Sequence, residues 1–189
     1  MKINYRKSTK FILLLISTLI IASVSAATYY SLTMTSTIEV YESDVYFVVG
    51  SDNNTKGLLV TLGNKNTTTT LTGLRAYPNA SFTYTDPVRV RNNGSSSVQL
   101  RLAPETDPSG NAADFVYIKF LLNATSAGDR KWLNYTSDGS SWTNPSGPTS
   151  WTTTGIAAAA EWPIVVMTKA NATATASNTV TIGITIDVD

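Results

Sequence analysis

Alternation of apolar and polar residues is the feature that most constrains how this chain can fold. The stretch ATYYSLTMTSTIEV, residues 27–40, places Tyr30, Leu32, Met34, Ile38 and Val40 on one face. A period of two residues is typical of a half-buried β-strand. The stretch exceeds the usual strand length of about 5–6 residues, so we predict that its first half projects as a free apolar strand. Such an edge needs a pairing partner, and a strand bent back onto its own sheet is the alternative.

The residues before this stretch have the composition of a secretory signal. A basic segment, residues 2–10, precedes the apolar run 11–21, and small residues follow at 23–27. The apolar run is shorter than the ~20 residues of a membrane-spanning helix, so we expect only transient membrane contact through the signal. The alternatives are a retained N-terminal anchor and a pilin-type leader cut before Phe11, which would keep its hydrophobic helix.

These features divide the chain into three parts. We predict a signal peptide over residues 1–26, a projecting N-terminal strand over 27–37 and a β-sandwich domain over 38–189. Removal of the signal peptide takes away four of the fourteen Lys and Arg residues and leaves ten against thirteen Asp and Glu. The sequence has no basic patch interleaved with aromatic residues, which argues against nucleic acid as a partner.

The composition also argues against an enzyme. The chain has no His and no Cys, which removes the commonest general base, the thiol nucleophile and the usual zinc ligands. We find no phosphate-binding loop and no spacing that selects a carboxylate pair, and we predict no catalytic residue, metal or cofactor. The loop-like segment 105–114 has several oxygen ligands, but it lacks the regular spacing of a calcium loop.

The rest of the chain predicts short strands joined by polar turns. We expect a hairpin over 87–103, with its valines and leucines inward and its arginines outward beside carboxylates, and a central strand over 115–122. We expect a last amphipathic strand over 179–189 and a single helix-like piece, GIAAAAE, at 155–161. An all-β sandwich follows from this pattern.

Two surface features bear on function. Trp132, Trp142 and Trp151 lie in or beside a long polar segment, where they either anchor that segment or form a sugar-stacking platform. Asparagines in the N-x-Ser/Thr pattern predict N-glycosylation, and most of them fall in loops or turns. These asparagines are Asn53, Asn66, Asn79, Asn93, Asn123, Asn134 and Asn171.

Several of these residues together resemble a known family. A secretory leader, a mature start of Ala followed by aromatics, the segment DPVRVRNNGSSSVQLRL at 86–102 and the closing TVTIGITI are similar to TasA/camelysin proteins. Within that group the chain resembles archaeal extracellular filament subunits, the thread proteins and bundling pili. The resemblance implies a jelly-roll-like β-sandwich with an extended N-terminal donor strand that fills a groove in the next subunit.

On this basis we expect a secreted, N-glycosylated filament subunit at the cell surface, with identical subunits as partners and a role in adhesion or biofilm. The donor strand would contain Tyr29, Tyr30, Leu32 and Met34, and the last strand with 115–122 would form the groove walls. The metalloprotease activity attributed to some camelysin-type relatives is not expected, because the chain has no His. A cell-surface carbohydrate-binding or adhesin module is the main alternative, and an S-layer-associated or viral coat role also fits the composition.

Overall fold

The computed structural model describes residues 43–55, 57–174 and 180–189. The predicted signal peptide (1–26) and donor strand (27–37), with Tyr29, Tyr30, Leu32 and Met34, lie outside the described residues. Within the described ranges the fold is all-β, as the alternation predicted, and its few helical turns are short 3-10 helices: η1 (Asn64–Asn66), η2 (Ala112–Asp114) and η3 (Ala127–Asp129). No helix in this part of the chain is long and apolar enough to cross a bilayer.

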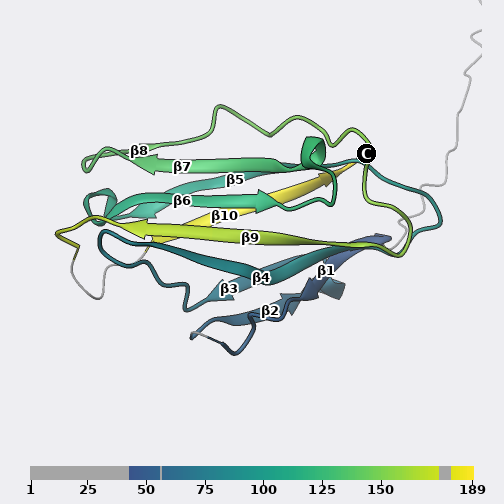
Figure 1. Cartoon of the computed structure of the whole chain (residues 1–189), viewed down its shortest axis with the longest axis horizontal. Coiled ribbons are helices and arrows are strands. Elements are labelled where there is room, and N and C mark those ends of the chain that lie inside the picture. Colours follow the sequence, from purple (N-terminus) through teal and green to yellow (C-terminus); the bar gives the residue numbers. More distant parts are fainter. Residues whose placement is uncertain (1–42, 56, 175–179) are drawn as a thin grey trace, which may run out of the picture. The chain divides into compact units, whose positions relative to one another are not determined.

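One layer of the sandwich is an antiparallel six-stranded sheet. Its spatial order is β1-β4-β9-β6-β7-β8. Strand β9 therefore lies in the middle of the sheet, between β4 and β6. Figure 1 shows this sheet nearest the viewer. Its strands are β1 (Val45–Val49), β4 (Ser81–Asn92), β6 (Phe115–Leu122), β7 (Lys131–Ser137), β8 (Trp142–Thr143) and β9 (Glu161–Ala170).

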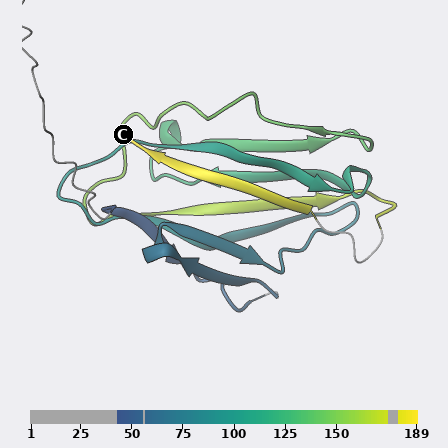
Figure 2. The ribbon, with the colours of Figure 1, turned by 180° about the vertical axis from the view of Figure 1, so that it is seen from behind.

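The second layer consists of two separate antiparallel pairs. One pair joins β5 (Leu100–Gly110) to β10 (Val180–Val188), and the other joins β2 (Leu59–Gly63) to β3 (Thr68–Thr72). Seen from behind, β10 and β5 cross in front of the large sheet, and the β2–β3 pair lies apart from them (Figure 2). The second layer is therefore discontinuous within the described residues.

The core lies between the two layers. Inward residues of the large sheet, such as Val88, Phe120 and Ile164, meet Leu100 and Leu102 of β5, and all are less than 5% exposed. The alternating side chains of β4, β5 and β6 produce this burial, because every second residue points inward. Burial of valine, leucine and phenylalanine side chains is the main stabilising term of such a sandwich, at about 1.5–3 kcal/mol each.

The prediction of a hairpin over 87–103 is wrong in its pairing. Its two strands form, but β4 pairs with β1 and β9, whereas β5 pairs with β10 in the other layer. The fully buried Asn92 directs the turn: its amide donates to the carbonyls of Ser96 (2.7 Å) and Ile156 (3.0 Å) and accepts from the Gly94 N–H (2.9 Å). These hydrogen bonds stabilise the turn in which the chain passes from β4 in the large sheet to β5 in the second layer.

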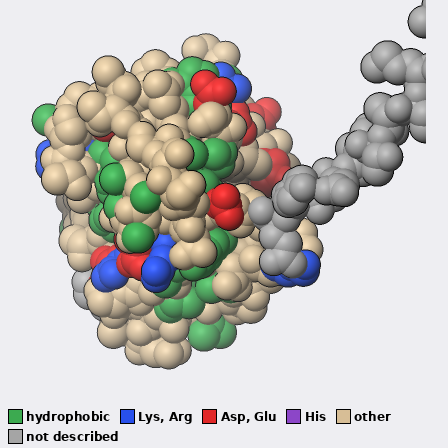
Figure 3. All heavy atoms as spheres, turned by 90° about the vertical axis from the view of Figure 1, so that its right-hand side faces the viewer, with side chains coloured by type: hydrophobic (Ala, Val, Ile, Leu, Met, Phe, Trp, Pro, Cys, Tyr) green, Lys and Arg blue, Asp and Glu red, His purple; other side chains and the backbone are tan. Residues whose placement is uncertain are grey.

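The outward arginines of these strands pair with carboxylates, as predicted. Arg89 binds Asp86 and Glu161, and Arg91 binds the second oxygen of Glu161. Positive and negative side chains lie next to one another at the end of the molecule drawn in Figure 3. These partly exposed pairs form a solvated face with no unpaired excess of positive charge.

The helix predicted over 155–161 does not form. Gly155 has φ of 72° and Ala159 has φ of 58°, and neither angle is compatible with a right-handed helix. Ile156 instead exchanges two backbone hydrogen bonds with Val98, at 2.8 and 3.2 Å. A run of four alanines is too short to offset the cost of helix nucleation against this pairing.

Candidate functional site

A groove of about 1350 Å³ lies between the two pairs of the second layer. Strand β10 lines one side along its length, from Val180 to Val188, and the segment 67–78, which contains β3, lines the other. The inner face of the large sheet forms the base, through residues such as Ile118, Phe120 and Ile164. The groove thus occupies the position of a missing strand in the second layer.

The exposed apolar surface of the groove belongs mainly to its walls. The base residues Ile118, Phe120 and Ile164 are already at most 6% exposed. Most of the half-buried hydrophobic side chains that border the core also line the groove: Phe47, Leu71, Leu74, Phe115, Val180, Ile182, Ile184 and Ile186. A contiguous apolar surface of this kind is typical of a binding groove.

The alternation in β10 explains why its side chains line the groove. Ile182, Ile184 and Ile186 point toward the core, whereas Thr185 and Asp187 alternate with them along the strand. The sequence predicted this strand and its polarity, and the family resemblance led us to expect residues 115–122 in a groove wall. The structure places Phe115, Ile118 and Phe120 in the lining, where β6 contributes to the base.

The two outer edges of the β5–β10 pair differ. A loop covers the start of the outer edge of β5, because Thr149 and Thr152 donate their backbone N–H groups to the carbonyls of Leu102 (2.7 Å) and Leu100 (2.9 Å). Their hydroxyls accept the N–H groups of the same two leucines. The other edge of β10 has no strand partner among the described residues. An uncovered edge beside an apolar groove is a template for strand addition.

Sequence reasoning did not identify the wall opposite β10. Its Thr-rich sequence indicated a loop or exposed edge, and only Leu71 and Leu74 signal its apolar inner side. Two hydrogen bonds fix this wall to the large sheet: the Arg75 N–H donates to the Tyr84 hydroxyl (2.9 Å), and the buried Thr168 hydroxyl donates to the Arg75 carbonyl (2.6 Å). The groove therefore has two walls of defined position.

Five of the seven predicted glycosylation asparagines lie in turns or directly after a strand, and Asn66 is the last residue of η1. Asn66 and Asn79 are exposed and have left-handed backbone angles, φ of 66° and 56°. Asn53 is half-buried in a turn, where its Oδ1 accepts from the Val60 N–H (2.9 Å). Asn93, Asn123 and Asn171 follow β4, β6 and β9 respectively. Asn134 differs from all of these because it lies within β7.

The three tryptophans considered as a sugar platform lie in different surroundings. Trp132 is on β7 and is 43% exposed. Trp142 packs against Phe115 with ring centroids 5.9 Å apart, and Trp151 lies 4.4 Å from the Arg101 guanidinium. Trp142 and Trp151 therefore anchor the long polar segment, and the structure does not assemble the three into one surface.

The segment considered for calcium is mostly strand. Residues 105–110 belong to β5, and the carboxylate of Asp114 accepts a hydrogen bond from Asn111. Across the described ranges, no three His, Cys, Asp or Glu side chains lie close enough to hold a metal ion.

A scan against models of protein families finds no match for this chain, and a search of curated protein sequences finds none either.

Proposed function

We propose that this protein is the structural subunit of a secreted, N-glycosylated extracellular filament that grows by donor-strand complementation. The observation that carries the proposal is the edge of β10 that has no strand partner among the described residues and lies beside an apolar groove. Residues 27–37 of a neighbouring subunit are the proposed occupant, since their sequence alternates and carries no charge. The resemblance to TasA/camelysin filament subunits belongs to this proposal.

The dimensions of the two partners agree. Strand β10 has nine residues, which corresponds to about 30 Å of antiparallel strand, and the donor segment has eleven. Main-chain hydrogen bonds to β10 would supply affinity, and Tyr30, Leu32 and Met34 would face the apolar base. Burial of three such side chains contributes roughly 5–8 kcal/mol before the costs of association.

The arrangement implies an open polymer. Each subunit would donate one strand and offer one groove, so that donor and acceptor surfaces differ. Contacts between unlike surfaces generate a fibre when their rotation does not close a ring. Because the chain has no cysteine, assembly would depend on this non-covalent interlock.

Cysteine cross-linking tests the proposal directly, since the chain has no cysteine of its own. One variant carries a cysteine in the donor strand at Thr33, and a second carries one on β10 at Thr181 or Thr185. Neighbouring antiparallel residues fall within the Cα separation of a disulfide, about 4.4–6.8 Å. When the two variants are mixed and assembled, we expect a covalent heterodimer on a non-reducing gel.

A matched control and a deletion complete the test. Thr106→Cys places an exposed thiol on β5, away from the open edge of β10, and should not cross-link to the donor. Deletion of residues 29–35 should give a secreted protein that forms no filaments by electron microscopy. Normal filaments from the deletion variant, or a disulfide formed only within one chain, would contradict the proposal.

A further inference from the structure

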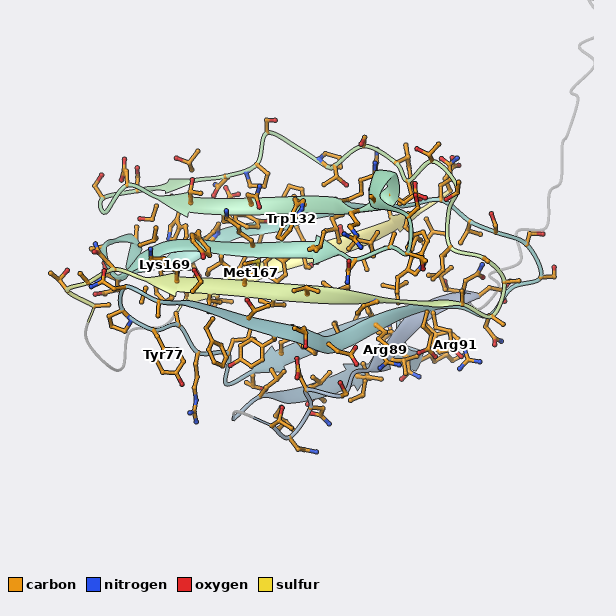
Figure 4. The ribbon with its side chains drawn as sticks, viewed as in Figure 1. Tyr77, Arg89, Arg91, Trp132, Met167 and Lys169 are labelled. Atoms are coloured by element: carbon orange, nitrogen blue, oxygen red, sulfur yellow. The ribbon has the colours of Figure 1, made fainter. Side chains whose placement is uncertain are left out.

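A shallow recess of about 300 Å³ lies on the outer face of the large sheet. Its lining comes from three adjacent strands: Trp132 and Asn134 from β7, Lys119 from β6 and Met167 from β9. Lys119 is the register partner of both Asn134 and Met167. Figure 4 shows Trp132 and Met167 on the face of the sheet that is turned toward the viewer, with β6 between them.

The alternation of β7 fixes the direction of two of these side chains. Leu133 and Tyr135 are at most 1% exposed and point into the core, so Trp132 and Asn134 both point outward. No hydrogen bond engages the Asn134 side chain within the described part of the chain. The Asn171 amide, by contrast, donates to the Ala113 carbonyl (3.1 Å). Asn134 thus presents its amide nitrogen beside an exposed indole.

The same spacing occurs a second time. Among the described residues, five large hydrophobic side chains are exposed, and only Tyr77 and Trp132 of these five are aromatic. Each precedes a glycosylation-pattern asparagine by two residues, at Asn79 and Asn134. The Tyr77 ring packs against Phe82 at 5.0 Å between centroids. Both of the exposed aromatics that the structure describes therefore lie next to a predicted modification site.

We infer that Trp132 is a platform for the first sugar of an N-glycan on Asn134. The inference rests on the secreted, glycosylated state proposed above. The C–H face of a pyranose is apolar and electropositive, and it fits the electron-rich face of an indole or phenol ring. Met167 would border the sugar, and the Lys119 ammonium would donate to its oxygens.

The covalent step needs a lipid-linked phosphate or pyrophosphate oligosaccharide as the sugar donor. The Asn134 Nδ2 attacks the anomeric carbon of that donor and forms a new N–C bond. The bond between that carbon and the phosphate oxygen breaks, and its electron pair leaves with the phosphate. Nδ2 gives one proton to a base of the transferring enzyme, and one N–H remains on the glycosylated amide.

A double-mutant cycle on the glycosylated full chain tests the platform. Thr136→Ala removes the acceptor pattern but keeps Asn134 and Trp132, and Trp132→Ala removes the platform but keeps the pattern. We expect mass spectrometry to find the glycan on Asn134 of the parent. Each single variant should melt several degrees lower than the parent, and the double variant no lower than Trp132→Ala alone, because the two residues act together.

Two controls make the outcome specific. In unglycosylated protein, Trp132→Ala should leave the melting temperature nearly unchanged. Thr125→Ala removes the pattern at Asn123, a site preceded two residues earlier by Leu121 rather than an aromatic, and should leave it unchanged even in glycosylated protein. An unmodified Asn134, or strictly additive effects of Trp132→Ala and Thr136→Ala, would overturn the inference.

Filament formation separates this result from the proposed function. The variant Thr136→Ala should still form filaments, since the recess lies on the outer face and the groove on the inner face of the large sheet. Filaments without a glycan on Asn134 would remove this inference alone. A coupled Trp132–Asn134 pair in a protein that forms no filaments would remove the proposed assembly alone.

Discussion

Arg101 of β5 donates its Nε–H to the Asp187 carboxylate of β10 over 2.7 Å, and this bond joins the two strands near the chain's C-terminus. Both side chains are about one-third exposed, at 31% and 35%. The guanidinium also stacks on Trp151, which holds it in place. This pair therefore ties the groove wall to the covered edge of the second layer.

We predict that Asp187→Asn loosens β10. Partly exposed ion pairs contribute about 0.2–1 kcal/mol, so amide exchange in 180–188 should accelerate by up to about fivefold. Hydrogen exchange followed by mass spectrometry measures this change. Asp189→Asn, at the last residue, is the control and should leave these rates unchanged. Equal rates in both variants would contradict the role given to Asp187.

The Asp86–Arg89 pair predicts a pH-dependent stability. The Arg89 guanidinium, aided by the Ser51 N–H, lowers the pKa of Asp86 from 3.8 to about 2. A lowered pKa in the folded state stabilises the fold above pH 3.8, and the contribution is lost as the pH falls toward 2. We expect parent and Asp86→Asn to differ by about 1–2 kcal/mol in unfolding free energy at pH 5 and to converge at pH 2.

Denaturant titration at both pH values measures this convergence. Asp107→Asn, which removes an exposed carboxylate from β5, is the control and should follow the parent across the range. A constant difference between parent and Asp86→Asn from pH 5 to 2 would contradict the assignment.

The Tyr135 hydroxyl predicts a stabilising substitution. Tyr135 is fully buried, its hydroxyl has no hydrogen-bond partner within the described residues, and burial raises its pKa to about 12. An unsatisfied buried polar group costs about 1–3 kcal/mol, so Tyr135→Phe should raise the unfolding free energy by about 1 kcal/mol. Tyr84→Phe is the matched control: its hydroxyl accepts the Arg75 N–H, and its loss should destabilise. Equal changes in unfolding free energy for Tyr135→Phe and Tyr84→Phe would contradict the prediction that only the Tyr135 hydroxyl is unsatisfied.

Substitution of two glycines by alanine distinguishes the cost of backbone strain from the cost of a steric clash. Gly155 has φ of 72°, and a Cβ there would lie 2.4 Å from the Val98 carbonyl oxygen. Gly139 has φ of 91° but open space around it. We expect Gly139→Ala to cost about 1 kcal/mol and Gly155→Ala clearly more, measured by chemical unfolding. A Gly155→Ala variant as stable as Gly139→Ala would show that the Val98 contact can relax.

The sequence predicted individual strands better than their pairing. The alternation in β10 and the apolar run of β6 gave their positions to within a residue, because side-chain periodicity is local information. The partner of β5 depended on Asn92, whose side chain turns the chain toward the other layer. The local sequence pattern does not show such a tertiary hydrogen bond. The turn-rich segment between β4 and β5 therefore predicted a hairpin.

The candidate site was predictable on one side only. The β10 wall has a strong apolar period, whereas the opposite wall offers only Leu71 and Leu74 in a Thr-rich sequence. Its position depends on the Thr168 and Tyr84 side chains, which bond to Arg75 from distant strands. The paired arrangement of Trp132 and Asn134 likewise required knowledge that Leu133 and Tyr135 point inward.

The lengthwise run of β10 along the groove has a mechanical consequence. In a filament assembled as proposed, a pull along the fibre would load the donor strand parallel to β10. All hydrogen bonds between the two strands would then resist the force at once, whereas a strand pulled sideways separates one bond at a time. Tensile strength would increase with the number of residues paired along β10, so shortening that strand would weaken the fibre before it weakened the fold.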